Sequence, residues 1–577
     1  MHTSIRTLGE LKQSGWTSST VKEEMRRNLI RMLREGEPLF PDIVGYEHTV
    51  IPQLEHALLA RHDLILLGLR GQAKTRILRL LVRFLDEYIP VVEGSEVNDD
   101  PLNPVSVYAR ERIEEMGDET PVSWLHRDKR YGEKLATPDT TVADLIGDID
   151  PIKAASLKLA LADERVINFG LIPRSNRGIF VINELPDLQP RIQVALLNIM
   201  QERDIQIRGF NVRIPLDLSM AFSANPEDYT NRGNIITPLK DRIDAQIITH
   251  YPRNVALGME ITSQEVGKRL TGSTEVRIHP IYRELIEEIA FQARTSDYVD
   301  QKSGVSTRMT ITAMEQALSS AEKRAITHGE EHAVVRIADV FNTVPALTGK
   351  IELVYEGEQE GAINVARHII GKAVNEVFQR HFPEPRRRED EQNPYDEILN
   401  WFRDGREIEI ADTMPEKEYR KVLDNVKGLG ELADTWLSGG SLMKGGSGSG
   451  SESGEGSGSG EGSGSAGRKG AEGRTGKTGK PGSADRSGDT GPEATGSAGS
   501  QESTPKRGSE ESGSSEYRYV LMDLVLEALH QNSMLGKEDV DQQRSFSDML
   551  GSMLGGMGDY GDFDDEDDDF DDFRDFR

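Results

Sequence analysis

One loop of eight residues constrains the fold of this chain more than any other feature. Residues 68–75 read Gly-Leu-Arg-Gly-Gln-Ala-Lys-Thr. The short run 63–67 before the loop is mostly apolar, which predicts a buried strand. Apolar residues at 77, 78, 80, 81, 84 and 85 predict a helix that opens at Thr75. A glycine-bearing loop between a strand and a helix, ending in Lys-Thr, is the arrangement that binds nucleotide phosphates.

The residue types of this loop indicate how it would bind ATP and Mg²⁺. Backbone N–H groups and the helix N-terminus meet the phosphate oxygens, Lys74 reaches the β- and γ-phosphates, and the Thr75 hydroxyl ligates Mg²⁺. The pattern G-x-x-x-x-G-K-[ST] has Ala73 at its second glycine. That alanine strains the loop only if its φ must be positive. We predict that the nucleotide is bound by Gly68, Gly71, Gln72, Ala73, Lys74 and Thr75.

A second predicted strand carries the acidic group that hydrolysis needs. Residues 179–182 read as a buried strand, and Asn183 and Glu184 follow at its carboxyl end, where open α/β sheets bind ligands. P-loop ATPases usually have Asp-Glu there, the Asp ordering Mg²⁺ and the Glu polarising water. Asn183 can accept a hydrogen bond from a magnesium-bound water but brings no negative charge. We therefore predict Thr75 and Asn183 at the metal and Glu184 as the general base.

Two more polar residues follow at positions that suit catalysis. The stretch 204–214 alternates around a turn, which predicts a β-hairpin. The next strand, 218–223, is followed by Asn225, which either forms a turn before Pro226 or holds the attacking water. Arg242 comes after a short turn and, taken alone, would be an ordinary surface cation.

Composition narrows the class of protein. The chain has 577 residues with 98 acidic against 69 basic side chains, a net charge of −29, which argues against coating nucleic acid. It has no cysteine, which excludes disulfides and thiolate metal sites. It also has no apolar run near the roughly 20 residues that span a bilayer, and its first residues lack the apolar core of a signal peptide. We expect a cytoplasmic protein with neither nucleic-acid nor membrane partners.

The pattern along the chain predicts several units. The capping box at Thr20 starts a helix, strands and helices then alternate as in an α/β unit with a parallel sheet, and helices follow. A Gly/Ser-rich stretch predicts a flexible tether, and apolar residues at helical spacing over 517–529 predict an amphipathic helix that docks a partner. The predicted units are an N-terminal helical segment (1–37), an α/β nucleotide-binding core (38–252), a helical lid (253–384), a helical extension (385–439), a disordered linker (440–515), an amphipathic helical segment (516–550) and an acidic tail (551–577).

Taken in order, these motifs resemble the AAA+ ATPases, most closely their magnesium-chelatase I-subunit and MoxR-like branch, over about residues 38–350. The resemblance places Ile43 and Val44 in the segment that packs on adenine, 68–75 on Walker A and 179–184 on Walker B. Residues 176–178 resemble a short sequence motif that precedes Walker B in this branch. The remaining matches are 141–162 with the helix-2 insert, 204–214 with the pre-sensor-1 hairpin, Asn225 with sensor 1, Arg242 with the arginine finger and Ser306-Thr307-Arg308 with sensor 2.

The resemblance implies an assembly as well as a fold. It implies a P-loop parallel-sheet core with a helical lid, arranged in a homo-hexameric ring with ATP between neighbouring subunits. Arg242 would act on the site of the adjacent subunit, and Arg308 would also act in trans. Members of this branch work with a von Willebrand factor A-domain protein. The Asp-rich tail of this chain lacks the Asp-x-Ser-x-Ser spacing of that domain, so such a partner would be a separate chain.

Three functions stay open at this stage. The first is an ATP-driven remodelling motor or chaperone that acts on a protein partner. The second is a magnesium-chelatase I subunit that drives Mg²⁺ insertion into a porphyrin, although the usual plan of that subunit lacks the segment after residue 440. The third is a nucleotide-gated scaffold with weak hydrolysis, which Ala73 and Asn183 suggest. An enhancer-binding transcription activator is disfavoured because its Gly-Ala-Phe-Thr-Gly-Ala loop is missing.

Overall fold

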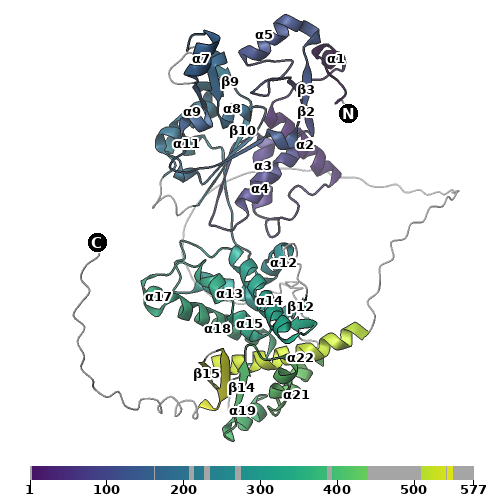
Figure 1. The fold of residues 1–577 in the computed structure, drawn as a ribbon, viewed down its shortest axis with the longest axis vertical. Helices are drawn as coiled ribbons and strands as arrows, with labels where there is room; N and C mark the ends of the chain where they lie inside the picture. The colour runs from purple at the N-terminus through teal and green to yellow at the C-terminus, as the bar shows by residue number, and fades with distance from the viewer. Residues whose placement is uncertain are drawn as a thin grey trace, which may run out of the picture.

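The structure is a computed structural model that describes residues 3–161, 163–206, 213–225, 234–266, 274–385, 393–438, 508–540 and 542–549. These residues form two lobes, and Figure 1 shows them one above the other. The first lobe runs from helix α1 to strand β11, and the second lobe from helix α12 to strand β16. The predicted acidic tail and residues 440–507 of the predicted linker lie outside the described residues.

The first lobe is built on a parallel sheet of five strands in the order β11-β1-β10-β7-β4. Every side chain of β7 is buried, which explains its unbroken apolar run. Because all five strands are parallel, their carboxyl ends meet at one edge of the sheet, and the predicted α/β parallel sheet is confirmed. The strands are β1 (Leu64–Leu67), β4 (Tyr131–Leu135), β7 (Gly178–Asn183), β10 (Leu218–Ala224) and β11 (Ala245–Ile248).

Helices cover both faces of this sheet. Successive side chains of a strand point to opposite faces, so the apolar side chains on each face need a covering layer. Leu64, Leu66 and Val181 pack under helices α2 (Val21–Glu35), α3 (Val50–Ala60) and α4 (Lys74–Leu80). Ile65, Phe180 and Ile182 point to the other face, under α9 (Pro190–Glu202) and α11 (Thr237–Arg242). Helix α2 starts with the predicted capping box between Thr20 and Glu23.

Smaller elements extend the first lobe beyond the sheet. Strands β8 and β9 pair antiparallel, as the hairpin prediction requires, although residues 207–212 between them lie outside the described part. Strands β2 and β3 form a second antiparallel pair, and β5 and β6 a third. These elements are α1 (Leu8–Gln13), β2 (Tyr88–Val92), α5 (Val107–Met116), β3 (Val122–His126), α6 (Val142–Leu145), β5 (Gly147–Ile149), α7 (Pro151–Leu157), β6 (Ile167–Phe169), α8 (Leu171–Arg174), β8 (Asp204–Gln206) and β9 (Arg213–Pro215).

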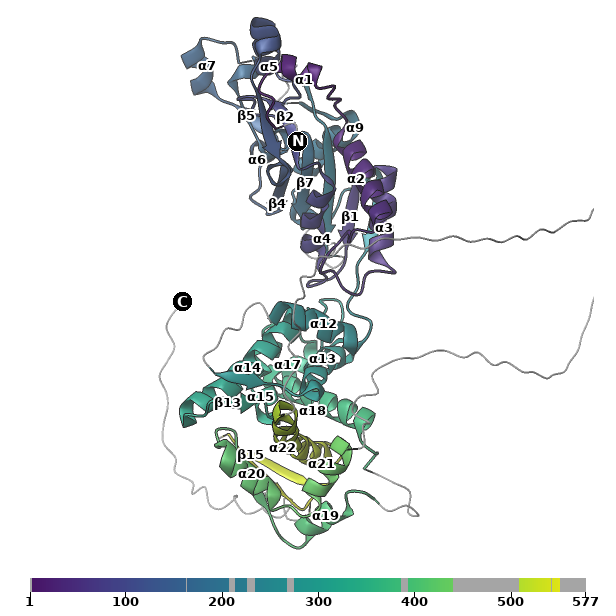
Figure 2. The same cartoon turned by 90° about the vertical axis from the view of Figure 1, so that its right-hand side faces the viewer.

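The second lobe is mainly helical, as Figure 2 shows from the side. In the described residues, its first part consists of seven helices and the parallel pair β12–β13. These elements are α12 (Val255–Val266), β12 (Glu275–Arg277), α13 (Pro280–Thr295), α14 (Arg308–His328), β13 (His332–Val334), α15 (Ile337–Phe341), α16 (Val344–Thr348), α17 (Tyr355–Glu360) and α18 (Ala362–His381).

The far end of the second lobe joins segments that lie on either side of residues 439–507. Strand β14 pairs antiparallel with β16, which in turn pairs with β15. The strand β14 therefore finds its partner more than a hundred residues later in the sequence. These elements are α19 (Asp396–Arg403), β14 (Ile408–Ala411), α20 (Glu416–Asp424), α21 (Leu429–Ser438), α22 (Gly508–Gln531), β15 (Gly536–Val540) and β16 (Gln543–Ser547).

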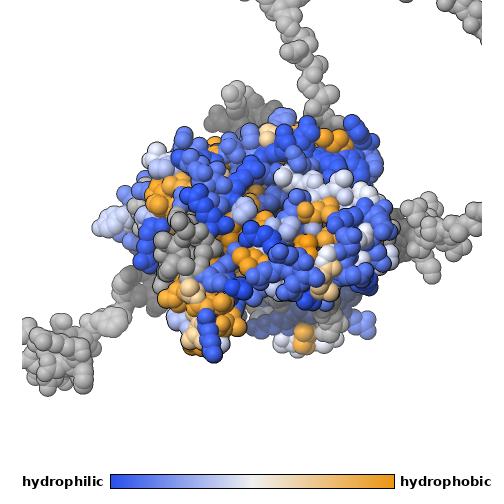
Figure 3. All heavy atoms as spheres, turned by 90° about the horizontal axis from the view of Figure 1, so that it is seen from above, coloured by the Kyte–Doolittle hydropathy of each residue, from blue (hydrophilic) through white to orange (hydrophobic). Residues whose placement is uncertain are grey.

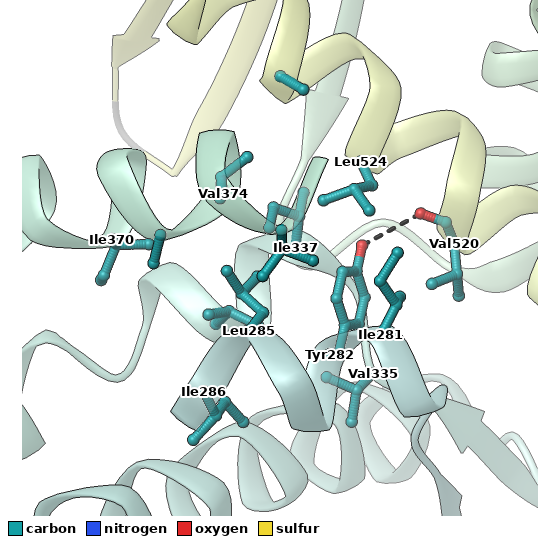
Figure 4. Packing of buried hydrophobic residues seen from close by; sticks show 14 of the residues in the cluster. Ile281, Tyr282, Leu285, Ile286, Val335, Ile337, Ile370, Val374, Val520 and Leu524 are labelled. Carbon is teal, nitrogen blue, oxygen red and sulfur yellow. Dashed lines mark hydrogen bonds between the residues drawn. The ribbon is translucent and has the colours of Figure 1, made fainter. Parts of the chain in front are cut away.

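Helix α22 overturns one expectation. It is the centre of the second lobe, packed against α18 and α21, and not an amphipathic helix with a face left free for a partner. Val520 and Leu524 belong to the same buried cluster as Ile337 and Val374. The Tyr282 hydroxyl donates a hydrogen bond of 3.1 Å to the Val520 carbonyl (Figure 4). The helix also starts at Gly508, inside the predicted linker, and Gly536–Val540 and Gln543–Ser547 form strands where a helical segment was expected.

Two acidic residues on α22 are fully buried and paired. Asp523 binds Arg544 of β16 at 3.0 Å and accepts a hydrogen bond from the Tyr419 hydroxyl at 2.9 Å. Glu527 binds Lys537 of β15 at 2.9 Å. Buried charges are tolerated when they are paired in this way. The pairs tie α22 to the hairpin that follows it.

The surface is mostly hydrophilic in the view from above, with hydrophobic residues in separate patches (Figure 3). Ile152 of α7 is 81% exposed. None of the described helices is both long and apolar enough for a membrane span.

Candidate nucleotide-binding site

The phosphate loop, residues 68–75, joins the end of β1 to the start of α4, as predicted. Gly71 has a φ of 78° and Ala73 a φ of 56°, so both are in the left-handed region. A left-handed backbone costs a residue with a Cβ roughly 1–2 kcal/mol, and glycine nearly nothing. The sequence predicts strain at Ala73 only if its φ is positive. Because its φ is positive, the backbone of Ala73 is strained.

We expect the substitution Ala73→Gly to stabilise the first lobe by about 0.5–1 kcal/mol, because it removes this strain while adding some entropy to the unfolded chain. Denaturant unfolding of the first lobe measures the effect. Ala57→Gly, in the middle of α3 with ordinary helical geometry, is the matched control and should destabilise the lobe. If both substitutions destabilise it, Ala73 does not hold the left-handed conformation.

Lys74 and Asn225 come together at the carboxyl edge of the sheet. The Lys74 ammonium donates to the carbonyls of Gly68 and Leu69 and to Asn225 Oδ1, the last at 2.7 Å. A Cβ at Gly68 would lie 1.9 Å from Thr249 Oγ1, so this position requires glycine. Thr249 also donates to Gln72 Oε1 at 2.6 Å, so the Gln72 side chain holds the loop in shape.

The second lobe contacts the phosphate loop directly. The Thr307 hydroxyl donates to the Gly71 carbonyl at 2.6 Å, and Arg70 donates to Ser303 Oγ at 2.8 Å. A Cβ at Gly71 would lie 2.1 Å from Ser306 Oγ. The predicted segment 306–308 is thus at the loop, with Arg308 exposed at the start of α14.

A pocket beside the loop could take the base of the nucleotide. It is lined by Ile43 and Val44, by the loop residues 71–73, and by Ile261 and Gln264 of α12. The Tyr46 hydroxyl donates to the carbonyls of Gln72, at 3.1 Å, and His250, at 2.7 Å, and burial raises its pKa, so it stays neutral. The structure therefore brings the segment predicted to contact adenine next to the phosphate loop.

Asn183 and Glu184 follow β7 at the same edge. Asn183 is buried, its Nδ2 donates to Glu133 Oε1 at 2.7 Å, and its Oδ1 accepts from the Ser223 hydroxyl at 2.9 Å. The Glu184 amide donates to Ser223 Oγ at 3.4 Å, and Glu184 has a φ of 54°. A left-handed residue at the end of a strand turns the chain sharply, and such strain is often found at functional sites.

The donor set at this edge fits Mg²⁺. The Thr75 hydroxyl and the Asn183 amide oxygen are hard oxygen donors, which Mg²⁺ prefers, and the Glu133 carboxylate behind Asn183 adds negative charge. Among the described residues, no group of three or more His, Cys, Asp or Glu could hold a metal by itself. Protein sites for Mg²⁺ with nucleotides have this sparse character, because phosphates and waters complete the coordination.

Arg242 is not near the phosphate loop of its own chain. It ends α11, and its Nε donates to Gln201 Oε1 at 3.1 Å. The next strand, β11, pairs Ala245 with Leu64 at the start of β1, whereas the loop follows the other end of β1. Arg242 therefore lies toward the amino edge of the sheet and the phosphate loop at the carboxyl edge.

Sequence reasoning missed the polar residues that hold the predicted ones in place. Glu133, Ser223 and Thr249 come from three different strands or strand ends, and each binds a residue far away in the sequence. The stretch 131–135 that contains Glu133 is neither apolar nor alternating. No local pattern could have identified it, although an acidic residue within a strand beside Walker B is a feature that a search could include.

Two curated proteins are similar in sequence to this chain. The magnesium-chelatase 38 kDa subunit of Cereibacter sphaeroides is 26% identical over 203 residues, which is 35% of this chain and 54% of the relative. The subunit of the same name from Rhodobacter capsulatus is 27% identical over 233 residues, which is 39% of this chain and 60% of the relative. The chain thus spans little more than half the length of these relatives. They confirm the resemblance to the magnesium-chelatase branch.

Solved structures also match this chain, with lower sequence identity and low TM-scores. The complex of subunits BchI and BchD of magnesium chelatase gives a TM-score of 0.29 with 21% identity, covering 56% of this chain and 98% of that one. NtrX from Brucella abortus in complex with ADP gives a TM-score of 0.31 with 14% identity, covering 54% and 58%. No protein-family model matches this sequence.

Proposed function

We propose that this chain is an AAA+ ATPase of the magnesium-chelatase/MoxR-like type, which uses ATP hydrolysis to remodel a protein partner in the cytoplasm. One observation carries the proposal: Lys74 of the phosphate loop binds Asn225 at the carboxyl edge of a parallel sheet, where Glu184 also lies. A phosphate-binding cation, a polar residue for water and a carboxylate are the three groups that hydrolysis of a phosphoanhydride needs. We take 38–252 as the nucleotide-binding core and 253–384 as the lid.

Each residue then has a chemical role. The loop N–H groups and Lys74 bind the phosphates, and Ile43 and Val44 pack on the base. Asn225 holds the attacking water, and Glu184 takes a proton from it as the water oxygen bonds to the γ-phosphorus. The bond between that phosphorus and the β–γ bridging oxygen breaks at the same time, and ADP leaves with the bonding electrons. Mg²⁺, when held by Thr75 and Asn183, supplies positive charge that offsets the phosphate oxygens. Hydrolysis changes the contacts of the loop with Ser303 and Thr307, and so moves the second lobe.

The position of Arg242 supports a ring. It lies toward the edge of the sheet opposite its own loop, and this position favours action on a nucleotide held by a neighbouring subunit. We therefore propose a homo-hexamer in which Arg242 of one subunit stabilises charge at the γ-phosphate of the next. Arg308, exposed beside the loop, would assist across the same interface.

Mixing two inactive variants tests this arrangement. Arg242→Ala should bind ATP normally and turn over about 10³-fold more slowly, on the scale of other arginine fingers. Glu184→Gln should also be inactive. Mixed rings contain interfaces with a native Glu184 facing a native Arg242, so mixing should restore phosphate release. Arg283→Ala, an exposed arginine on α13, is the control for the loss of a surface charge. A mixture that stays inactive at every ratio would contradict action in trans.

The proposed partner rests on the resemblance of the sequence to the magnesium-chelatase/MoxR-like branch, and not on the geometry of the site. We propose that a separate von Willebrand factor A-domain protein works with this ring, and we expect no nucleic-acid partner because the chain carries a net charge of −29. Capture of proteins on the Glu184→Gln ring in the presence of ATP, compared with ADP, would identify the partner.

A second candidate is a magnesium-chelatase I subunit, which the two curated relatives favour. Co-expression with porphyrin-binding and A-domain subunits, followed by a metal-insertion assay, separates it from a protein-remodelling motor. The third reading, a nucleotide-gated scaffold with weak hydrolysis, is motivated by the strained Ala73 and by Asn183. Equal turnover by the native and Glu184→Gln proteins would favour the scaffold.

A further inference from the structure

A carboxylate on the strand next to β7 lies directly behind Asn183. Glu133 is in β4, the edge strand, where it pairs with Val181 two residues before Asn183. Its side chain is 21% exposed, so it is largely shielded from water. Its Oε1 accepts a hydrogen bond of 2.7 Å from Asn183 Nδ2.

This carboxylate determines which way the Asn183 amide points. An ionised carboxylate only accepts hydrogen bonds, so the NH₂ group of Asn183 must face Glu133. The amide oxygen then faces the Ser223 hydroxyl, which donates to it at 2.9 Å. The same hydroxyl accepts from the Glu184 amide at 3.4 Å. A continuous series of hydrogen bonds therefore connects Glu133 to the backbone of the proposed general base.

We propose that Glu133 is a positioning residue that supplies, from the neighbouring strand, the negative charge that Asn183 lacks. Asn183 then provides the oxygen and Glu133 the charge, two functions that a single aspartate combines in related sites. The inference rests on the proposed function. It adds a residue and a strand that no motif of the sequence assigns to the metal.

Arg79 is the opposing charge that must be considered. Its Nε and Nη2 bind the Glu133 carboxylate at 2.9 and 3.1 Å. The Arg79 side chain is 64% exposed, so water screens its charge, whereas the carboxylate faces the buried Asn183. The guanidinium therefore reduces the field of Glu133 at the site without cancelling it. Removing the charge of Glu133 and removing that of Arg79 should therefore change the Mg²⁺-dependent nucleotide affinity in opposite directions.

The test compares nucleotide affinity with and without Mg²⁺, measured with a fluorescent ATP analogue in excess Mg²⁺ and in EDTA. Glu133→Gln should lose roughly 10- to 100-fold of the affinity gain that Mg²⁺ provides, as for other outer partners of metal ligands. Its affinity in EDTA should stay within about twofold of native, because Lys74 and the loop are unchanged. Arg79→Ala should increase the gain, because it removes the opposing charge.

Relocating the charge makes the test sharper. The double variant Glu133→Gln with Asn183→Asp puts the carboxylate at the strand end and an amide behind it. It should restore the Mg²⁺ gain to within about threefold of native, a coupling that independent sites would not show. Tyr131→Phe removes a 3.3 Å hydrogen bond to the same carboxylate without changing its charge, and it should leave the gain unchanged.

Three results would overturn the inference. The first is a native Mg²⁺ gain in Glu133→Gln. The second is an equal loss in Glu133→Gln and Arg79→Ala, which would show an ion pair with a purely structural role. The third is a double variant no better than Glu133→Gln. A native protein that binds the analogue no better than Lys74→Ala, in EDTA as well as in Mg²⁺, would overturn the proposed function and the inference with it.

Discussion

A chain that ends at residue 438 is expected to lose the fold of the second lobe. Burying one large apolar side chain contributes about 1.5–3 kcal/mol, and a whole domain is stable by only about 5–15 kcal/mol. Removing α22 and its hairpin loses more free energy of burial than the whole free energy of unfolding of a domain. It also leaves α13, α18 and α21 with exposed apolar faces. The buried apolar residues lost are Val520, Leu521, Met522, Leu524, Val525, Leu526, Ala528, Leu529, Leu535 and Phe546.

Thermal unfolding followed by circular dichroism, with limited proteolysis, measures this loss. The matched control deletes residues 451–480, a part of the Gly/Ser-rich stretch that leaves α21 and α22 in place, and should unfold like the native chain. We also expect the truncated chain to lose ATP turnover, because the second lobe contacts the phosphate loop through Ser303 and Thr307. A truncated chain with native unfolding and a native pattern of proteolysis would contradict the central place of α22.

The substitution Glu184→Gln is expected to retain ATP and to lower its hydrolysis by about 10²- to 10⁴-fold, the usual contribution of a general base. Glutamine has nearly the same shape, and the backbone contact of this residue with Ser223 does not involve the carboxylate. Binding should therefore be unchanged while proton transfer from water is lost. Gel filtration with labelled ATP measures the retention of uncleaved nucleotide.

Asp187→Asn is the matched control for Glu184→Gln. This carboxylate follows in the next turn of the chain, at the end of the short helix Leu185–Asp187, and has no assigned role in the site. It should turn over ATP like the native protein. An equal loss of hydrolysis in both variants would mean that the charge of this turn matters and not the identity of Glu184.

The parts of the site that follow strand ends could be predicted from the sequence. Lys74, Glu184 and Asn225 each follow an apolar run, and parallel strands bring their carboxyl ends to one edge. Their positions after predicted strands were therefore enough to place these three residues at the same edge of the sheet. Ala73 shows the limit of this reasoning, because a sequence gives the residue type but its φ of 56° depends on the packed loop.

Helix α22 could not be placed from its sequence. Apolar residues at helical spacing predict a helix, but whether a free face remains depends on what surrounds it. Asp523 and Glu527 read as a polar face, yet both are fully buried by partners in β15 and β16. The other neighbours, α18 and α21, lie before residue 439, and no local pattern links them to residues 517–529.

Glu133 escaped prediction for a related reason. Its interaction with Asn183 is a contact between neighbouring strands, and register between strands is set by the whole sheet. A sequence with Asn in place of the usual aspartate shows that a charge is missing. Only the structure shows which side chain stands behind the amide.

We propose that the carboxyl edge of the first lobe hydrolyses ATP through Glu184. The most direct measurement is phosphate release by the native chain and by Glu184→Gln, side by side, at saturating ATP and Mg²⁺ and at a protein concentration that permits ring assembly. We expect steady release by the native chain and a rate at least about 10²-fold lower in the variant, with ATP bound equally by both. Equal rates in the two proteins, or no release by the native chain, would contradict hydrolysis through Glu184.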